Sequence, residues 1–116
     1  MRSKAINEID GLSNQLVKNN SIIFGLGETG LSVARFLKRR GEHFVLVDTR
    51  DIPPNMALIN EMFPETQQVF GAKKDFDISS FNQLVISPGL SHKEQLVEKA
   101  IASGISVIGD IELFSR

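Results

Sequence analysis

Cysteine is absent from the 116-residue sequence, which excludes disulfide frameworks, thiolate zinc sites and cysteine nucleophiles. No apolar run approaches the roughly 18 residues that a membrane-spanning helix needs. The N-terminal segment carries Glu8 and Asp10 and no apolar stretch of the kind found in secretory signals. We therefore expect a cytoplasmic protein with no membrane partner.

A strong charge of either sign is also lacking. The chain has 13 lysines and arginines against 14 aspartates and glutamates, a net charge of -1, and no basic run with interleaved aromatic residues. Nucleic acid is therefore not an expected partner. Internal repeats and low-complexity segments are absent as well, and the 41% of hydrophobic residues is ordinary for one packed domain.

Short apolar runs alternate with helical patterns from residue 21 onward. The runs predict strands, and the segments between them carry apolar residues at helical spacing. Residues 1–20 have only a weak apolar period, and we interpret them as a leader that is at most partly ordered. The predicted strands are residues 21–24, 44–48, 68–70, 84–86 and 106–108.

Glycine, proline and capping residues mark where the predicted helices begin and end. The first helix spans residues 30–40 and ends at Gly41, in the place that glycine favours after a helix. The other boundary signals are Pro53 and Pro54 at the start and Pro64 at the stop of a second helix, Ser91 and Glu94 as a capping box for a third helix through Ser103, and Asp110 as the N-cap of a fourth.

Alternating strands and helices indicate βαβ units, hence a parallel sheet with helices on both faces. Right-handed crossovers favour a doubly wound, Rossmann-like α/β fold, here with about five parallel strands. We expect one such domain over residues 21–116. Ligands of this fold bind beyond the carboxyl ends of the strands.

The first predicted strand leads into a Gly-x-Gly-x-x-Gly motif that opens the first helix. Gly25 permits a tight turn, Gly27 lets the backbone approach a phosphate, and Gly30 lets the helix pack close to the strand. The first helical turn offers free N–H groups and the positive end of the helix dipole to an anion, and Thr29 adds a hydroxyl. Glu28 is expected to point to solvent, because a carboxylate repels a diphosphate. The motif predicts a diphosphate site, although a glycine-rich turn without a ligand would show the same residues.

Asp48 ends the second predicted strand, where dinucleotide-binding folds carry a carboxylate for a ribose hydroxyl. Thr49 and Arg50 follow and could hydrogen-bond to a base or stack on it. An aspartate in an ordinary turn would occupy the same place. The residues alone leave three functions open: the cofactor domain of an NAD-dependent dehydrogenase, a module for another nucleotide diphosphate, and a regulatory nucleotide sensor.

Two further segments are not general features of this fold. They are residues 84–91, Leu-Val-Ile-Ser-Pro-Gly-Leu-Ser, and residues 109–114, Gly-Asp-Ile-Glu-Leu-Phe. Together with residues 25–32 and 48–50, in this order and spacing, they resemble the N-terminal domain of the MurD family of Mur ligases, the UDP-N-acetylmuramoyl-L-alanine:D-glutamate ligases. The resemblance covers residues 21–116.

The resemblance implies that the full-length protein joins D-glutamate to UDP-N-acetylmuramoyl-L-alanine with ATP, in peptidoglycan synthesis, and that this domain holds the UDP moiety. Glu28 departs from the family, in which this position is more often apolar. The departure concerns only the side chain, because the backbone at this position would supply the contact to the diphosphate. The residues that match the family's UDP site are Gly27, Glu28, Thr29 and Gly30, whose backbone amides would face the diphosphate, Asp48, Thr49 and Arg50, around the uracil and its ribose, and Ser87 and Gly89, on the diphosphate and sugar side.

A Gly-Lys-Ser/Thr loop of the kind that grips ATP does not occur in the sequence. We therefore expect ATP and Mg²⁺ to bind elsewhere in the full-length protein, as D-glutamate does, and expect no cofactor and no metal in this domain. The chain is interpreted as the first domain of a longer ligase, its last helix leading toward an ATPase domain. By itself it is expected to bind UDP weakly and to catalyse nothing.

The remaining polar residues are assigned ordinary roles. His43 and His92 have no evident nucleophile or orienting partner and are expected at the surface. Asp110 and Glu112 are interpreted as helix-start residues rather than a metal pair. A solvated loop is predicted for Lys73, Lys74, Asp75 and Asp77, and core positions for the Met and Phe residues and for Leu96, Val97, Ala100 and Ile101.

Overall fold

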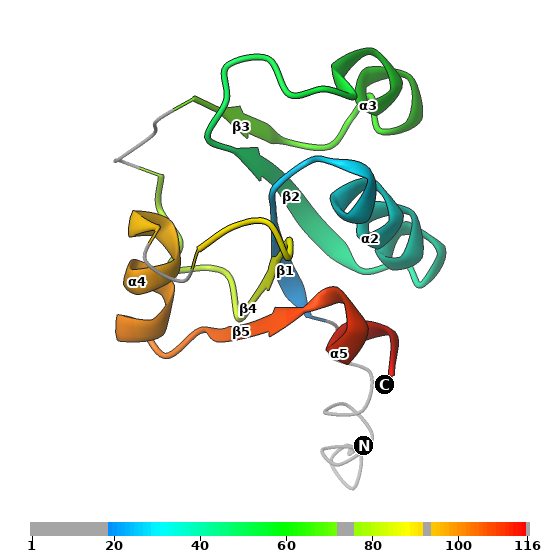
Figure 1. The fold of residues 1–116 in the computed structure, drawn as a ribbon. Coiled ribbons are helices and arrows are strands. Elements are labelled where there is room, and N and C mark those ends of the chain that lie inside the picture. The colour runs from blue at the N-terminus through cyan, green and yellow to red at the C-terminus, as the bar shows by residue number, and fades with distance from the viewer. Residues whose placement is uncertain (1–18, 72–75, 92–93, 116) are drawn as a thin grey trace, which may run out of the picture.

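The structure is a computed structural model that describes residues 19–71, 76–91 and 94–115. Its strands form one parallel sheet in the order β3-β2-β1-β4-β5 (Figure 1). The Rossmann fold has this order in its first five strands, so the predicted fold class is confirmed. The strands are β1 (Asn20–Phe24), β2 (His43–Asp48), β3 (Gln68–Phe70), β4 (Gln83–Ile86) and β5 (Ser106–Gly109).

Helices cover both faces of the sheet (Figure 1). Helices α2 (Glu28–Arg39), α3 (Met56–Met62) and α5 (Asp110–Phe114) pack on one face, and α4 (Gln95–Ala102) packs on the other. Neighbouring residues of each central strand point to opposite faces, so each strand contributes to both hydrophobic layers. Ile23, Leu46 and Val85 face the layer under α2, and Ile22, Val45 and Leu84 face the layer under α4.

The centre of the sheet explains why the strand predictions hold. Ile22, Ile23 and Phe24 of β1 are each at most 1% exposed, because β1 has a parallel partner on either side and helices above and below. A strand buried on both faces needs a continuous apolar run rather than an alternating one. Ser21 in β1 and Gln83 in β4 are buried polar residues near the beginnings of their strands. Their side chains bond to each other, since the Gln83 amide donates to the Ser21 hydroxyl over 3.0 Å.

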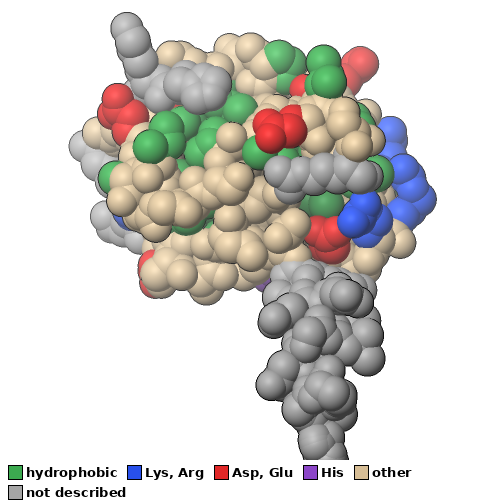
Figure 2. All heavy atoms as spheres, turned by 90° about the horizontal axis from the view of Figure 1, so that it is seen from below, with side chains coloured by type: hydrophobic (Ala, Val, Ile, Leu, Met, Phe, Trp, Pro, Cys, Tyr) green, Lys and Arg blue, Asp and Glu red, His purple; other side chains and the backbone are tan. Residues whose placement is uncertain are grey.

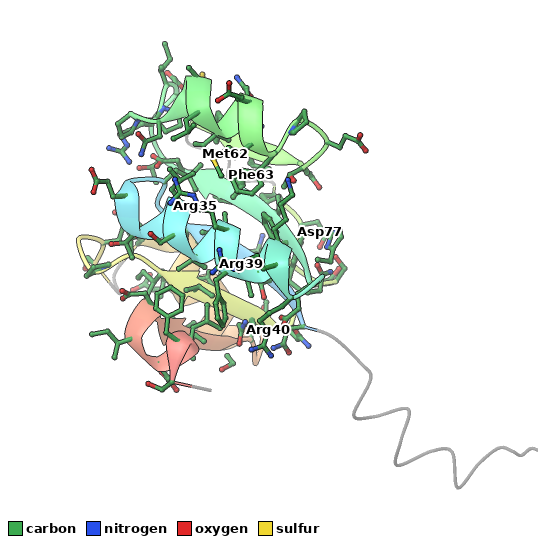
Figure 3. The ribbon with its side chains drawn as sticks, turned by 90° about the vertical axis from the view of Figure 1, so that its right-hand side faces the viewer. Arg35, Arg39, Arg40, Met62, Phe63 and Asp77 are labelled. Carbon is green, nitrogen blue, oxygen red and sulfur yellow. The ribbon has the colours of Figure 1, made fainter. Side chains whose placement is uncertain are left out.

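The basic residues of α2 lie on its outer side, away from the sheet. Figure 3 shows Arg35 and Arg39 along this helix and Arg40 just after its end, and Figure 2 shows Lys and Arg side chains gathered at one edge of the molecule. Lys38 joins α2 to the end of α3, because its ammonium donates to the Met62 carbonyl over 2.7 Å. A cation near the last carbonyls of a helix also favours the helix dipole.

Two of the predicted helix starts are wrong. The prolines at 53 and 54 do not open α3; the Met56 N–H donates to the Pro53 carbonyl in a turn, and the helix begins after it. The helix predicted to begin after Ser91 begins later as well. Glu94 is itself the N-cap residue, and no side chain caps the helix there, so α4 begins only at Gln95.

Three other predictions near the C-terminus also need correction. Asp110 is the first residue of α5 and not its cap, a place that Gly109 takes. Ile101 is 55% exposed although it was expected in the core, because α4 turns only Val97 and Ala100 fully inward. Phe114 is 43% exposed and meets the ring of Phe36 edge-on, with ring centroids 5.0 Å apart.

Several predictions concern residues that are not described. The leader up to residue 18, the loop residues Lys73, Lys74 and Asp75, and His92 all lie outside the described ranges. His43 and Asp77 are described, and both are exposed as predicted. In the part of the chain that the structure describes, no helix has the length and apolar character to cross a bilayer.

Candidate functional site

A pocket of about 430 Å³ opens where β1, β2 and β4 end. Three loops form it, one after each strand, and it lies at the point where the strand order reverses between β1 and β4. That reversal is the usual ligand site of a doubly wound sheet. Of the residues predicted from the sequence, it is lined by Gly27, Glu28, Thr29, Asp48, Thr49, Arg50, Ser87 and Gly89.

The three glycines of the first loop meet three different steric demands. Gly25 has φ of +100°, a conformation that side chains rarely adopt. A Cβ on Gly30 would lie 1.9 Å from the Gly25 carbonyl oxygen, so this buried residue permits the close approach of α2 but, unlike the other predicted site residues, does not line the pocket. A Cβ on Gly27 would meet nothing within 4 Å, because this position faces open space.

The start of α2 presents backbone donors to this space. Gly27 is the N-cap residue and no side chain caps the helix; the N–H of Leu31 is bonded to the Gly27 carbonyl over 3.0 Å. The amides of Glu28, Thr29 and Gly30 precede that bond, and the first amides of a helix have no acceptor within it. The Glu28 side chain is exposed, as expected. The arrangement can hold an anion against the positive end of the helix dipole.

Asp48, by contrast, is turned inward. Its residue is 1% exposed, and one carboxylate oxygen accepts the Leu26 N–H over 2.8 Å. Arg50 donates to the carboxylate three times: from its backbone N–H over 2.9 Å, from Nε over 2.8 Å and from Nη2 over 2.7 Å. The carboxylate therefore joins the glycine loop after β1 to the loop after β2.

These contacts also keep Asp48 charged. Burial by itself raises the pKa of this carboxyl, but the hydrogen bonds from Arg50 and Leu26 and the charge of Arg50 outweigh burial and lower the pKa below its ordinary value. The same pair raises the pKa of the Arg50 guanidinium. A buried carboxylate with these partners holds its loop in place at neutral pH.

The turn after β4 closes the opposite wall. The Ser87 hydroxyl donates to the Gly25 carbonyl over 3.0 Å, and the Ser87 N–H donates to the Phe24 carbonyl over 3.1 Å. The Leu90 N–H returns to the Ser87 carbonyl over 3.0 Å and completes the turn. The sequence did not predict that Pro88 and Leu90 also line the pocket; an apolar residue directly after a Pro-Gly turn was the available signal for Leu90.

Metal-binding clusters are not found at this pocket or elsewhere in the described ranges, where no group of three or more His, Asp or Glu side chains could hold an ion. Asp110 and Glu112 lie in the first turn of α5, as a helix dipole favours. The pocket offers main-chain amides, one guanidinium and hydroxyls beside the carboxylates of Glu28 and Asp48, and its donors suit the binding of an anion and a polar base.

Comparison with known proteins agrees with this geometry. Residues 19–109 match the family model of the N-terminal domain of MurD-like Mur ligases. Relatives include UDP-N-acetylmuramoylalanine–D-glutamate ligases of Pseudomonas aeruginosa (39% identical over 95 residues, 82% of this chain and 21% of the relative), Nitrosococcus oceani (43% over 99 residues, 85% and 22%) and Coxiella burnetii (38% over 96 residues, 83% and 22%). This chain spans about a fifth of the length of these curated relatives. It belongs to the family of MurD-like N-terminal domains of Mur ligases.

Proposed function

We propose that this chain holds the UDP moiety of UDP-N-acetylmuramoyl-L-alanine in the pocket where β1, β2 and β4 end. The protein to which it belongs would join D-glutamate to that substrate in peptidoglycan synthesis, using ATP and Mg²⁺ bound outside this domain and forming ADP. The names of the relatives support the substrate. The observation that carries the proposal is the uncapped start of α2, which faces open space at Gly27.

In this proposal each wall of the pocket serves one part of the ligand. The amides of Glu28, Thr29 and Gly30 receive the diphosphate, with the Thr29 hydroxyl beside them. The loop of Asp48, Thr49 and Arg50, which lines the pocket, surrounds uracil and its ribose. Ser87 and Gly89 close the diphosphate and sugar side.

A calorimetric titration of the chain with UDP, UDP-N-acetylmuramoyl-L-alanine and NADH tests the proposal. We expect both uridine ligands to bind more tightly than NADH, and no ligase activity from the chain alone. Tighter binding of NADH than of the UDP compounds would favour the dehydrogenase alternative and overturn the proposal.

The variant Gly27→Val tests the role of the loop. Its side chain fills the space that a phosphate needs, so we expect UDP affinity to fall about 100-fold, the loss of one or two hydrogen bonds to a charged group. Gly109→Val is a matched control, because Gly109 is the N-cap of α5 and its Cβ would also meet nothing within 4 Å. Unchanged UDP affinity in Gly27→Val, with binding by the parent chain, would count against the diphosphate site.

A further inference from the structure

We infer that α5 is a connecting helix with two apolar sides. Leu113 packs on this domain, and the side formed by Ile111 and Phe114 receives the domain that follows in the full-length ligase. The inference rests on the proposed function in one respect, because it takes the chain as the first domain of a longer ligase. It concerns a surface outside the pocket, which neither Ile111 nor Phe114 lines.

Helix α5 carries exposed apolar side chains on one side. Of its five residues only Leu113 is buried, whereas Ile111 is 77% and Phe114 43% exposed. Residues three apart are neighbours on the surface of a helix. Single apolar residues are common on protein surfaces, but adjoining ones more often mark an interaction site. The outer side of α5 therefore has the character of a docking surface.

The surface continues from α5 onto α2. The Phe114 ring meets the partly buried Phe36 ring edge-on, and the Arg40 guanidinium lies over the Phe36 ring, 5.2 Å from its centroid. Figure 3 shows Arg35 and Arg39 on the outer side of the same helix. Aromatic residues and arginine are enriched where proteins meet. The surface thus fits an apolar partner that is bordered by carboxylates.

The comparisons indicate which partner covers this surface. The family model of the N-terminal domain matches residues 19–109 and stops directly before α5. The matched region makes up only 21–22% of the relatives, so most of such a ligase follows an N-terminal domain of this kind. A helix at that boundary can contact both neighbours, since interfaces between domains are built like those between proteins. The following domain is therefore the occupant we propose.

The length of α5 supports a second packing partner. Isolated helices shorter than about 12–15 residues are marginal in water and depend on tertiary packing. In this structure α5 has five residues and buries one of them. We therefore expect it to open locally in the chain alone and to be protected where a second domain covers it. Amide hydrogen exchange reports this difference directly.

Hydrogen exchange of the chain and of the full-length protein, both without nucleotide, tests the inference. The probe is the Ser115 amide, which donates to the Ile111 carbonyl over 3.1 Å. We expect this amide to exchange at least about tenfold more slowly in the full-length protein. Equal exchange rates in the two proteins would overturn the inference, and this comparison needs no variant.

A pair of isoleucine variants separates docking from other causes of protection. Ile111→Ser removes the exposed apolar side chain at little cost in helix propensity, because serine and isoleucine rank alike. Ile101→Ser is the matched control, since Ile101 is 55% exposed on α4, on the opposite face of the sheet. In the full-length protein, Ile111→Ser should speed exchange of the Ser115 amide at least about tenfold, and Ile101→Ser should not. Equal effects of the two substitutions, or an equal effect of Ile111→Ser in the chain alone, would overturn the inference.

A second copy of the chain is the competing occupant. Sedimentation velocity of the chain should show a monomer. A dimer that Ile111→Ser dissociates and Ile101→Ser does not would assign the surface to a second copy and overturn the inference. Failure of the proposed function is seen separately: a chain that does not bind UDP overturns the UDP site, whereas exchange is measured without nucleotide and still decides the role of α5.

Discussion

The two ends of the parallel sheet carry polar groups that are used in opposite ways. At the amino ends, Asn20 and Asn82 exchange backbone and side-chain bonds: the Asn20 N–H donates to the Asn82 side-chain oxygen and the Asn82 N–H to the Asn20 carbonyl, both over 3.0 Å. The Asn20 amide also donates to the Ser80 carbonyl over 2.8 Å, and its oxygen contacts Nδ1 of His43. These groups satisfy one another.

At the carboxyl ends, the carboxylate of Asp48 is likewise satisfied, but the amides at the start of α2 face a pocket. Polar groups that are paired within the chain stabilise it, and those left open at a cavity can bind a ligand. The difference teaches that a polar cluster is not in itself a sign of function; what matters is which donors remain without an internal acceptor.

The largest loss of stability should come from Gly30→Ala, which places a side chain between α2 and the loop after β1, at the carboxyl ends of the strands. The new Cβ would lie 1.9 Å from a backbone oxygen, which can be relieved only by moving α2 or the loop. We expect the free energy of unfolding in urea to fall by about 3 kcal/mol, the upper part of the range for overpacking.

Gly27→Ala is the matched control for Gly30→Ala, three residues away in the same motif. Its Cβ would meet nothing within 4 Å, so only the preference for glycine at an N-cap is lost, at a cost of about 1 kcal/mol. Equal destabilisation by the two variants would contradict the steric division between the two glycines.

The sequence was sufficient to predict the sheet and the steric roles of the glycine loop. Buried parallel strands are continuous apolar runs, and the glycines at 25 and 30 meet the steric demands expected of them, while Gly27 faces open space. The spacing of apolar residues did not predict burial where tertiary contacts determine it. Ile101 has the helical spacing of a core residue, but it is exposed and only Val97 and Ala100 of α4 are buried.

The hydrogen bond between the Leu26 N–H and the Asp48 carboxylate could not be predicted from the sequence for a similar reason. A carboxylate at a strand end can turn outward to a ligand or inward to its own chain, and only the position of the neighbouring loop settles which it does. Arg50, two residues further on, was predicted beside the base, and its bonds to Asp48 were not foreseen. The helix starts at Met56 and Gln95 were missed because turns precede them.

A smaller effect is expected from Asn20→Ala at the amino ends. The variant loses the hydrogen bonds of its side chain to Ser80 and His43, which should lower the free energy of unfolding by about 1–2 kcal/mol. UDP affinity should not change, since the residue lies at the opposite end of β1 from the pocket. Asn60→Ala, on the exposed side of α3, is the control. Loss of UDP binding in Asn20→Ala would contradict the conclusion that polar groups at the amino ends stabilise the chain and do not bind the ligand.

The smallest effect concerns pH. Because folding lowers the pKa of Asp48, the carboxylate contributes stability above its unfolded pKa of about 4, and this contribution is lost as the pH falls through the lower folded value. Urea unfolding of the chain and of Asp48→Asn should therefore differ most near neutrality and converge in acid. A difference that stays constant below about pH 4 would show that Asp48 is not held by its charge.

The contact between Gly25 and Ser87 couples two loops that are 62 residues apart in the chain. A Cβ at position 25 would come within 2.7 Å of the Ser87 hydroxyl oxygen and 2.9 Å of the Ser87 Cβ, and the backbone there has φ of +100°, so no change at Ser87 would make room for a larger residue at position 25. Over evolutionary time position 25 should therefore stay glycine even while residues on the turn after β4, which are under no such constraint, are free to vary.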